Sequence, residues 1–261
     1  GGSKDQINTI FNEMSNGKVN FGISFSEYFG SRGDSKIIFS NGKVNGTTLF
    51  ALDCDHASHL LVSNSNGVIG SVSLDSQGID CVDLITVDKT RVFKEINFNN
   101  VTVEVLEKTL NSTTAIEKSL DAGRIVTAAD SLGAAQAMID KAVSYSKERK
   151  QFNRAIGSFQ AVKHMCAEMV AELEPCYSLV WHAAHSFDKD ENDARLMACH
   201  AKSHVSDVAK KVSKKATEVH GGMGFTDLLG LHFWFKRIGL NRQLLGAPEI
   251  IRSEAAKIQG L

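Results

Sequence analysis

One apolar stripe constrains the fold of this chain more than any other feature of its sequence. Between residues 159 and 183, apolar side chains recur every three or four positions without a break. That spacing matches the turn of an α-helix and places all of these side chains on one face. A helix with such a face must bury it against other elements, so we expect a helical bundle around it. The stripe consists of Phe159, Val162, Cys166, Met169, Leu173, Cys176, Val180 and Ala183.

The rest of the C-terminal half has the same periodicity. Helical patterns cover residues 115–147 and 190–219, and a further helix is expected over residues 248–259. The charged segment DKDEN separates two of these helices. Long helices joined by short connections favour an antiparallel four-helix bundle, which we assign to residues 111–261.

Residues 18–110 follow a pattern that is typical of β-strands. Segments 36–46 and 59–74 each hold two short apolar runs separated by Asn-Gly, a strong sign of a β-hairpin. Residues 91–103 alternate apolar and polar side chains, as a half-buried strand does. The predicted fold class is therefore α+β, with an antiparallel β domain followed by an antiparallel four-helix bundle. We interpret residues 1–17 as the remnant of an N-terminal helical segment.

Composition and charge narrow the class of protein. Hydrophobic residues make up 43% of the chain and charged residues 23%, which is the balance of a globular protein. The net charge of -1 gives no basic field for nucleic acid or an anionic membrane, and no apolar run is long enough to span a bilayer. Five scattered cysteines indicate reduced thiols, and nine histidines without completing ligands indicate no metal site. We expect a cytoplasmic protein, although a mitochondrial matrix protein without its leader would have the same composition.

Two short segments carry the residues with the clearest chemistry. SKERKQFNRAIGSFQ holds Arg149, whose guanidinium suits phosphate oxygens, Phe152, whose ring can stack on a flat group, and Gln160, whose amide can bond a polar edge. VHGGMGFTD holds three glycines within four residues, which indicates a backbone that another group approaches closely. Alone, the first segment also fits a solvated charged turn, and a helix C-cap explains one of the glycines. Together they lie at predicted helix ends, where unpaired backbone groups favour a phosphate-bearing ligand. The three glycines are Gly221, Gly222 and Gly224.

The order R-x-x-F…Q after one long helix and H-G-G-x-G-F-T after another resembles the flavin-dependent acyl-CoA dehydrogenases. The resemblance covers roughly residues 18–261 and implies an FAD cofactor and an acyl-CoA substrate. It also implies an N-terminal helical domain, a middle β domain and a helical bundle that together enclose both. By this resemblance Arg149, Phe152 and Gln160 reach the FAD of a neighbouring subunit, and the three glycines let the pyrophosphate and ribose approach the backbone. Asn153 and Ala155 depart from the glycine and proline of the family motif.

Weaker matches extend the resemblance to both domains. FSEYFGSRGDS resembles the family loop T-E-P-x-x-G-S-D, which implies that Ser26 and Ser31 contact the flavin ring and the substrate thioester. Phe50 falls where the family has an aromatic residue beside the flavin, although a core strand aromatic would look the same. LDAGR resembles the substrate-contacting segment that opens the first bundle helix and implies roles for Asp121 and Arg124. The alternative for this pair is a first-turn aspartate with an exposed arginine.

The glutamate that the family uses as catalytic base is missing from both of its usual positions. This base removes the α-proton of the thioester. Its commoner position is in a Glu-Gly-Thr before the last helix, where QLLGAPEIIR has Leu245 for the glutamate and Ala247 for the threonine. The other position directly precedes the arginine of the first bundle helix and is occupied by Gly123. Neither leucine nor glycine can accept a proton.

Three interpretations of the missing base remain open. The chain is one subunit of a heteromeric acyl-CoA dehydrogenase whose partner supplies the carboxylate. This is favoured by GFTDLLGLHFWFKR, which resembles a stretch of steroid-degrading subfamilies but has Leu228 in place of their glutamate. Alternatively, Glu249 or Asp227 serves as a relocated base in a homo-oligomeric flavoenzyme. The third interpretation is a non-catalytic scaffold that binds acyl-CoA or protein.

Overall fold

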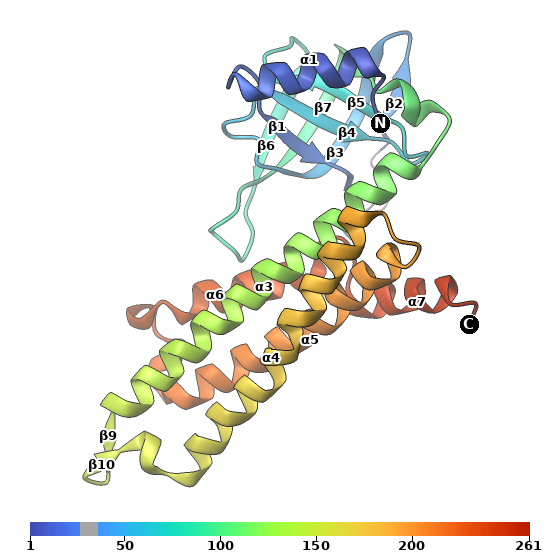
Figure 1. The fold of residues 1–261 in the computed structure, drawn as a ribbon. Helices are drawn as coiled ribbons and strands as arrows, with labels where there is room; N and C mark the ends of the chain where they lie inside the picture. The colour runs from blue at the N-terminus through green and yellow to red at the C-terminus, as the bar shows by residue number, and fades with distance from the viewer. Residues whose placement is uncertain (27–35) are drawn as a thin grey trace. The chain divides into compact units, whose positions relative to one another are not determined.

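The computed structural model describes residues 1–26 and 36–261. These residues form two compact units, 1–120 and 121–261. Ser31 lies outside the described residues. Each unit has a hydrophobic core of its own. Figure 1 shows the strands in the N-terminal part of the chain and the long helices in the C-terminal part.

The first unit is built on one sheet with the strand order β6-β7-β3-β1-β4-β5-β8, in which β2 also pairs with β3. Its neighbouring strands are antiparallel except for β1 and β4, which run parallel with Phe21 opposite His59. The sheet is therefore mixed and not purely antiparallel as expected, because β3 and β4 pair with opposite edges of β1. The strands described are β1 (Phe21–Ser24), β2 (Ile38–Ser40), β3 (Lys43–Leu52), β4 (His59–Ser63), β5 (Ile69–Ser73), β6 (Ile79–Leu84), β7 (Phe93–Thr102) and β8 (Glu104–Val105).

Both predicted hairpins are confirmed. Asn41 and Gly42 turn between β2 and β3 with φ values of 50° and 69°, as a two-residue hairpin of type I′ requires. The second hairpin joins β4 to β5 through a loop in which the Asn64 side chain accepts hydrogen bonds from the backbone of Asn66 and Val68. An N-terminal helix, α1 (Lys4–Ser15), begins at a capping box between Ser3 and Gln6.

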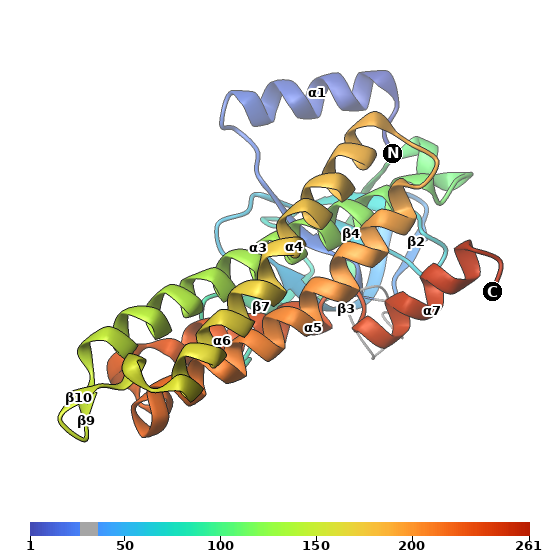
Figure 2. The same cartoon turned by 60° about the horizontal axis from the view of Figure 1, so that its bottom comes forward.

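The second unit contains the long helices. They are α3 (Thr114–Glu148), whose first turns belong to the first unit, α4 (Gln160–Lys189), α5 (Ala194–His220), α6 (Leu231–Gln243) and α7 (Pro248–Ile258). The predicted helices are confirmed, and the apolar stripe of α4 supplies five fully buried or nearly buried side chains to the core. Figure 2 shows α3, α4 and α5 running along one another.

The fourth helix of the bundle is α6, which the sequence pattern did not predict. Its Leu231 and Ile238 join the core formed by α3, α4 and α5, whereas α7 packs on α5 in a small cluster around Ile251. Polar contacts also hold α6 in place, because Arg237 Nε lies 2.8 Å from a carboxylate oxygen of Asp130 on α3. An ion pair thus helps to position α6, and apolar periodicity in the sequence does not reveal an ion pair.

Candidate functional site

A two-residue hairpin follows the end of α3. Strands β9 (Lys150–Gln151) and β10 (Arg154–Ala155) pair antiparallel, and Phe152 and Asn153 form the turn with φ values of 52° and 62°. A type I′ turn needs positive φ at both central residues, and asparagine adopts this conformation more readily than most residues. Asn153 therefore supports the turn at the position where the family motif has glycine.

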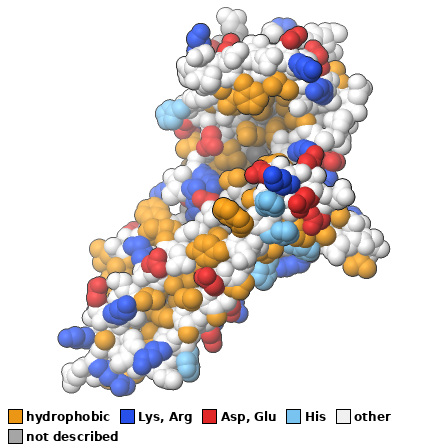
Figure 3. All heavy atoms as spheres, viewed as in Figure 1, with side chains coloured by type: hydrophobic (Ala, Val, Ile, Leu, Met, Phe, Trp, Pro, Cys, Tyr) orange, Lys and Arg blue, Asp and Glu red, His pale blue; other side chains and the backbone are white. Residues whose placement is uncertain are grey.

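The hairpin presents an exposed aromatic ring. Phe152 is 87% exposed, and its ring meets Phe159 edge-to-face at 6.1 Å between centroids. The guanidinium of Arg154 lies over the same Phe159 ring at 3.9 Å. Gln160 begins α4 and is also exposed, with its amide nitrogen 3.3 Å from the His164 ring. In the same view as Figure 1, Figure 3 shows Lys and Arg side chains gathered at the hairpin end of the bundle.

The fold explains two of the three glycines that follow α5 and leaves the third unexplained. Gly221 ends α5 with φ 59° and ψ -141°, a conformation that essentially only glycine adopts. A Cβ on Gly224 would lie 2.7 Å from the Thr217 carbonyl oxygen, so packing excludes a side chain there. Gly222 has a φ outside the left-handed region, and nothing lies within 4 Å of the Cβ position.

These contacts correct the argument that only a close ligand explains the three glycines together. The fold itself requires Gly221 and Gly224. Gly222 lies in η3 (Gly221–Phe225) with open space above its backbone, so it is the member that the fold leaves unexplained.

The hairpin and the glycine segment lie at the same end of the bundle. The ring of His220, directly before Gly221, stacks on Tyr145 at 4.6 Å, and Tyr145 is one helical turn before Arg149. His220 Nδ1 donates to the Ala216 carbonyl oxygen at 2.7 Å. Burial lowers the pKa of His220, which outweighs the opposite effect of that hydrogen bond and keeps the ring neutral. The structure thus brings together two motifs that are about 70 residues apart in the sequence.

A second group of predicted residues meets near the start of the second unit. Leu245 fills the space beside Gly123, because a Cβ added to Gly123 would lie 2.5 Å from Leu245 Cδ1. Leu245 is 8% exposed and has φ 60°, an uncommon conformation for leucine. The two positions at which the family has its base therefore face each other here, and an apolar contact occupies the space between them.

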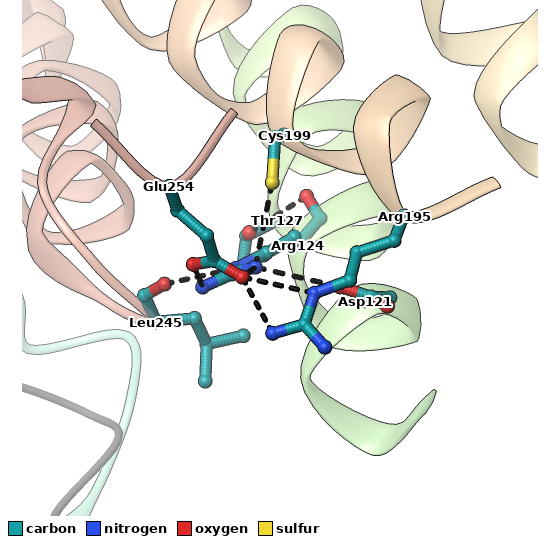
Figure 4. A network of polar contacts seen from close by, with 7 residues as sticks. All are labelled: Asp121, Arg124, Thr127, Arg195, Cys199, Leu245 and Glu254. Atoms are coloured by element: carbon teal, nitrogen blue, oxygen red, sulfur yellow. Dashed lines mark hydrogen bonds and ion pairs between the residues drawn. The ribbon is translucent and has the colours of Figure 1, made fainter. Parts of the chain in front are cut away.

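Arg124 lies buried beside this contact, at the centre of an ionic network (Figure 4). Its two terminal nitrogens meet the two carboxylate oxygens of Glu254 at 3.1 and 2.7 Å, and its Nε donates to the Leu245 carbonyl oxygen at 3.3 Å. Asp121, also buried, accepts from the same guanidinium at 3.4 Å. Arg195 adds two more bonds to Glu254, at 3.0 and 2.7 Å.

Glu254 is held as an anion in this network. Burial by itself would raise its pKa, but the hydrogen bonds from Arg124 and Arg195 lower the pKa below its ordinary value. The donors of Arg124 point to protein groups, so it is not the exposed arginine that the sequence allowed as an alternative. Sequence reasoning did not find Glu254, because nothing in its surroundings along the chain marks a partner about 130 residues away.

Comparison with known proteins decides the family. The family model "Acyl-CoA dehydrogenase, C-terminal domain" matches residues 113–259, more than half of the chain. The chain belongs to the acyl-CoA dehydrogenase family.

Relatives and solved structures agree with this assignment. The chain is 32% identical over 198 residues to the 3-(aryl)acrylate reductase of Clostridium sporogenes, covering 74% of this chain and 48% of that protein. It is 42% identical over 108 residues to the caffeyl-CoA reductase–Etf complex subunit CarC of Acetobacterium woodii, covering 41% of this chain and 28% of that protein. The butyryl-CoA dehydrogenase structure from Megasphaera elsdenii matches the fold with a TM-score of 0.88 at 22% identity, over 99% of this chain and 73% of that one. The matches thus span at most about half the length of these two curated relatives.

The carboxylates considered as a relocated base lie on the surface. Glu249 accepts a hydrogen bond from Arg242 at 2.6 Å, and its pKa is lowered first by a backbone hydrogen bond and then by Arg242. The Asp227 side chain is 97% exposed and lies 3.5 Å from His232. Both carboxylates are largely exposed to solvent.

In the first unit, Ser26 and Phe50 have different environments. The Ser26 hydroxyl is buried, donates to the Leu49 carbonyl oxygen at 2.8 Å and accepts from the Leu49 amide at 2.7 Å. Phe50 has φ 57° and lies at an irregularity of the β3–β7 pairing, with its ring edge-to-face to Phe93 at 6.3 Å. Such bulges redirect a side chain, which explains why Phe50 is only half-buried in the middle of a strand.

The described part of the chain contains no helix long and apolar enough to cross a membrane. Its His, Cys, Asp and Glu side chains also form no group of three or more that could hold a metal ion.

Proposed function

We propose that this chain is a subunit of an FAD-dependent oxidoreductase that dehydrogenates an acyl-CoA thioester between its α and β carbons. We further propose that a homologous second subunit supplies the catalytic base. The observation that carries the proposal is the contact between Leu245 and Gly123, because it fills both family base positions with apolar atoms. The relatives named as reductases act, by their names, in the reverse direction of the same type of chemistry.

The residues at the hairpin end fit an FAD cofactor. Arg149 is exposed, the Phe152 ring is 87% exposed, and the backbone at Gly222 is open to close approach. We propose that Arg149, Phe152 and Gln160 bind the cofactor together with the glycine segment. When bound, FAD would accept the hydrogen that leaves the β carbon as hydride.

The same arrangement favours a site shared between subunits. Arg124 and the hairpin are separated by about 25 residues of helix α3, which corresponds to roughly 37 Å along the helix axis. A separation of this size is large for one binding site, which favours two different sites. We propose that the hairpin end completes the cofactor site of a neighbouring chain, and that Leu245 and Arg124 lie at the chain's own acyl site.

The alternatives have less support. A relocated base would have to be Glu249 or Asp227, which are exposed, or Glu254, which two guanidiniums hold ionised with a lowered pKa. A scaffold without flavin does not explain why Gly222 has no side chain. The substrate is proposed only as an acyl-CoA thioester, without a specific acyl group. A steroid side chain is one candidate for the acyl group, because the GFTDLLGLHFWFKR stretch resembles that of steroid-degrading subfamilies.

The visible absorption spectrum tests the proposal. We expect flavin absorption from the chain alone or co-expressed with a homologous subunit, and bleaching by an acyl-CoA in the absence of oxygen. Gly222→Ala should remove flavin without lowering the melting temperature of the flavin-free protein, since a methyl group has space there. Gly133→Ala is the matched control, because its surroundings on α3 are equally open and far from the hairpin. Colourless protein in both preparations would exclude the flavoenzyme.

A gain-of-function variant tests the missing base. Leu245→Glu places a carboxylate at the commoner family position, next to Gly123. If the site is otherwise intact, flavin-loaded Leu245→Glu should bleach with an acyl-CoA in the absence of a partner. Unchanged flavin absorption would mean that the chain's own acyl site is lost as well as its base.

A further inference from the structure

A cavity of about 260 Å³ lies between helix α1 and one face of the sheet, within the first unit. Figure 1 shows α1 lying across the strands of the sheet. Leu60 on β4 and Val72 on β5 pair with each other and belong to the core. Side chains alternate between faces along a strand, so their neighbours His59 and Ser71 point to the opposite face, where they line the cavity.

Helix α1 turns an acidic face toward this cavity. Asp5 and Glu13 both line it and lie eight residues apart, which corresponds to about 12 Å along the helix axis. The apolar side of the helix points elsewhere, because Phe11 is 64% exposed and no residue of α1 is buried. Hydrophobic packing therefore does not account for the orientation of α1. Gln6 helps to fix it, since its side-chain amide donates to Glu104 Oε1 at 2.9 Å.

The cavity has a negative lining without a compensating charge from lysine or arginine. The carboxylates of Asp5, Glu13 and Glu104 line it, and no described lysine or arginine does. In the described part of the first unit, none of these three carboxylates forms an ion pair. A ligand that suits this lining carries positive charge.

The floor of the cavity offers an unsatisfied hydroxyl. Ser71 is 9% exposed, and its Oγ has no hydrogen-bond partner among residues 1–26 and 36–261. Buried polar groups are nearly always paired, because a lost hydrogen bond to water is costly. Since Ser71 lines the cavity, this hydroxyl is available to a polar group of a ligand.

We propose that this cavity binds a linear polyamine, an aliphatic chain that carries several ammonium groups. An ammonium group has donors and no acceptor, which matches carboxylates spread over about 12 Å and the hydroxyl of Ser71. Phe21, whose ring centroid lies 5.6 Å from that of His59, gives apolar contact to methylene groups and attracts a cation to its face. The volume is at the small end of ligand pockets, as a thin flexible chain requires. This inference does not depend on the proposed function, because these residues are not assigned to the flavin or the acyl group.

Isothermal titration calorimetry of the purified protein with spermidine tests the proposal, and we expect saturable binding of one molecule per chain. Ser71→Ala should weaken the affinity about fivefold and leave the melting temperature of the spermidine-free protein unchanged, since no hydrogen bond within the protein is lost. Glu13→Gln removes a charge-assisted contact and should weaken the affinity at least tenfold. Asp80→Asn is the matched control, because Asp80 is exposed on β6, at the opposite edge of the sheet from β8. Its affinity should stay within about twofold of the wild type.

Four results would overturn the proposal. Equal weakening by Glu13→Gln and Asp80→Asn would mean that spermidine only screens the surface charge. Unchanged affinity in Ser71→Ala would mean that the ligand does not reach the floor of the cavity. Binding of MgCl₂ with the same stoichiometry and affinity as spermidine would mean that the aliphatic chain plays no part. Absence of saturable binding to the wild type would leave the cavity to a lysine side chain of a partner protein.

Discussion

Gly123→Ala probes the contact on which the missing-base interpretation depends. The new Cβ would lie 2.5 Å from Leu245 Cδ1 and 3.8 Å from its Cγ, so the leucine would have to move. Its movement is restricted, because Leu245 is 8% exposed and its carbonyl oxygen accepts a hydrogen bond from Arg124. Overpacking of this kind costs about 2 kcal/mol, against which alanine gains about 1 kcal/mol over glycine in a helix. The expected net loss in the free energy of unfolding is about 1 kcal/mol.

A double-mutant cycle separates the clash from the change in helix propensity. In Leu245→Ala the space beside residue 123 is empty, so adding Gly123→Ala should stabilise the protein by about 1 kcal/mol. The two effects of Gly123→Ala then differ by about 2 kcal/mol, which is the coupling energy of the pair. Gly133→Ala gives the reference for propensity alone, because it lies on the same helix with nothing within 4 Å. Urea denaturation followed by circular dichroism measures all of these values.

The result that would refute the reasoning is a Gly123→Ala variant as stable as Gly133→Ala in the wild-type background. Coupling below about 0.5 kcal/mol would have the same meaning, because it is the size of effect seen between independent sites. Leu245 would then not fill the space beside Gly123, and this space would be open to substrate or to a partner's carboxylate.

Three further predictions concern other parts of the chain. Because the folded pKa of Glu254 is lowered, its contribution to stability is complete above the unfolded pKa and is lost as the pH falls through the folded pKa. Glu254→Gln should therefore flatten the acid limb of a melting-temperature profile below about pH 5 and cost roughly 2 kcal/mol at pH 7. Asn153→Gly should change the free energy of unfolding by less than about 0.5 kcal/mol while Asn153→Val loses at least about 1 kcal/mol in chemical denaturation, since only the first tolerates φ 62°. Exposed Cys81 should react first with a thiol reagent at pH 8, and mass spectrometry should find Cys176 and Cys199 unlabelled until the protein unfolds, because burial raises the pKa of each to about 11.

Much of the fold follows from signals that lie within a few residues of each other. Asn41-Gly42 supplies the positive φ values of its turn, and the stripe from Phe159 to Ala183 places one face of α4 in the core. Helix α6 was not predicted from the sequence, because its two core residues, Leu231 and Ile238, are too few to form a clear apolar stripe. Its position also depends on the contact between Arg237 and Asp130. The parallel pairing of β1 with β4 was also missed, because strand direction within a sheet depends on the path of the whole chain.

The features of the candidate site also divide into those that the sequence indicates and those that only the tertiary structure shows. The sequence by itself indicated the helix ends around Phe152 and the chemistry of Arg149, because side-chain type and local backbone preferences act over short distances along the chain. The β-hairpin that turns at Phe152 and Asn153 was not predicted. Only the tertiary structure decided that Leu245 fills the space beside Gly123 and that Glu254 neutralises Arg124. These partners are more than 120 residues apart, and their contacts depend on how the helices of the bundle pack. The structure also explains Gly221 by its backbone conformation and Gly224 by packing, and it leaves Gly222 open to a ligand.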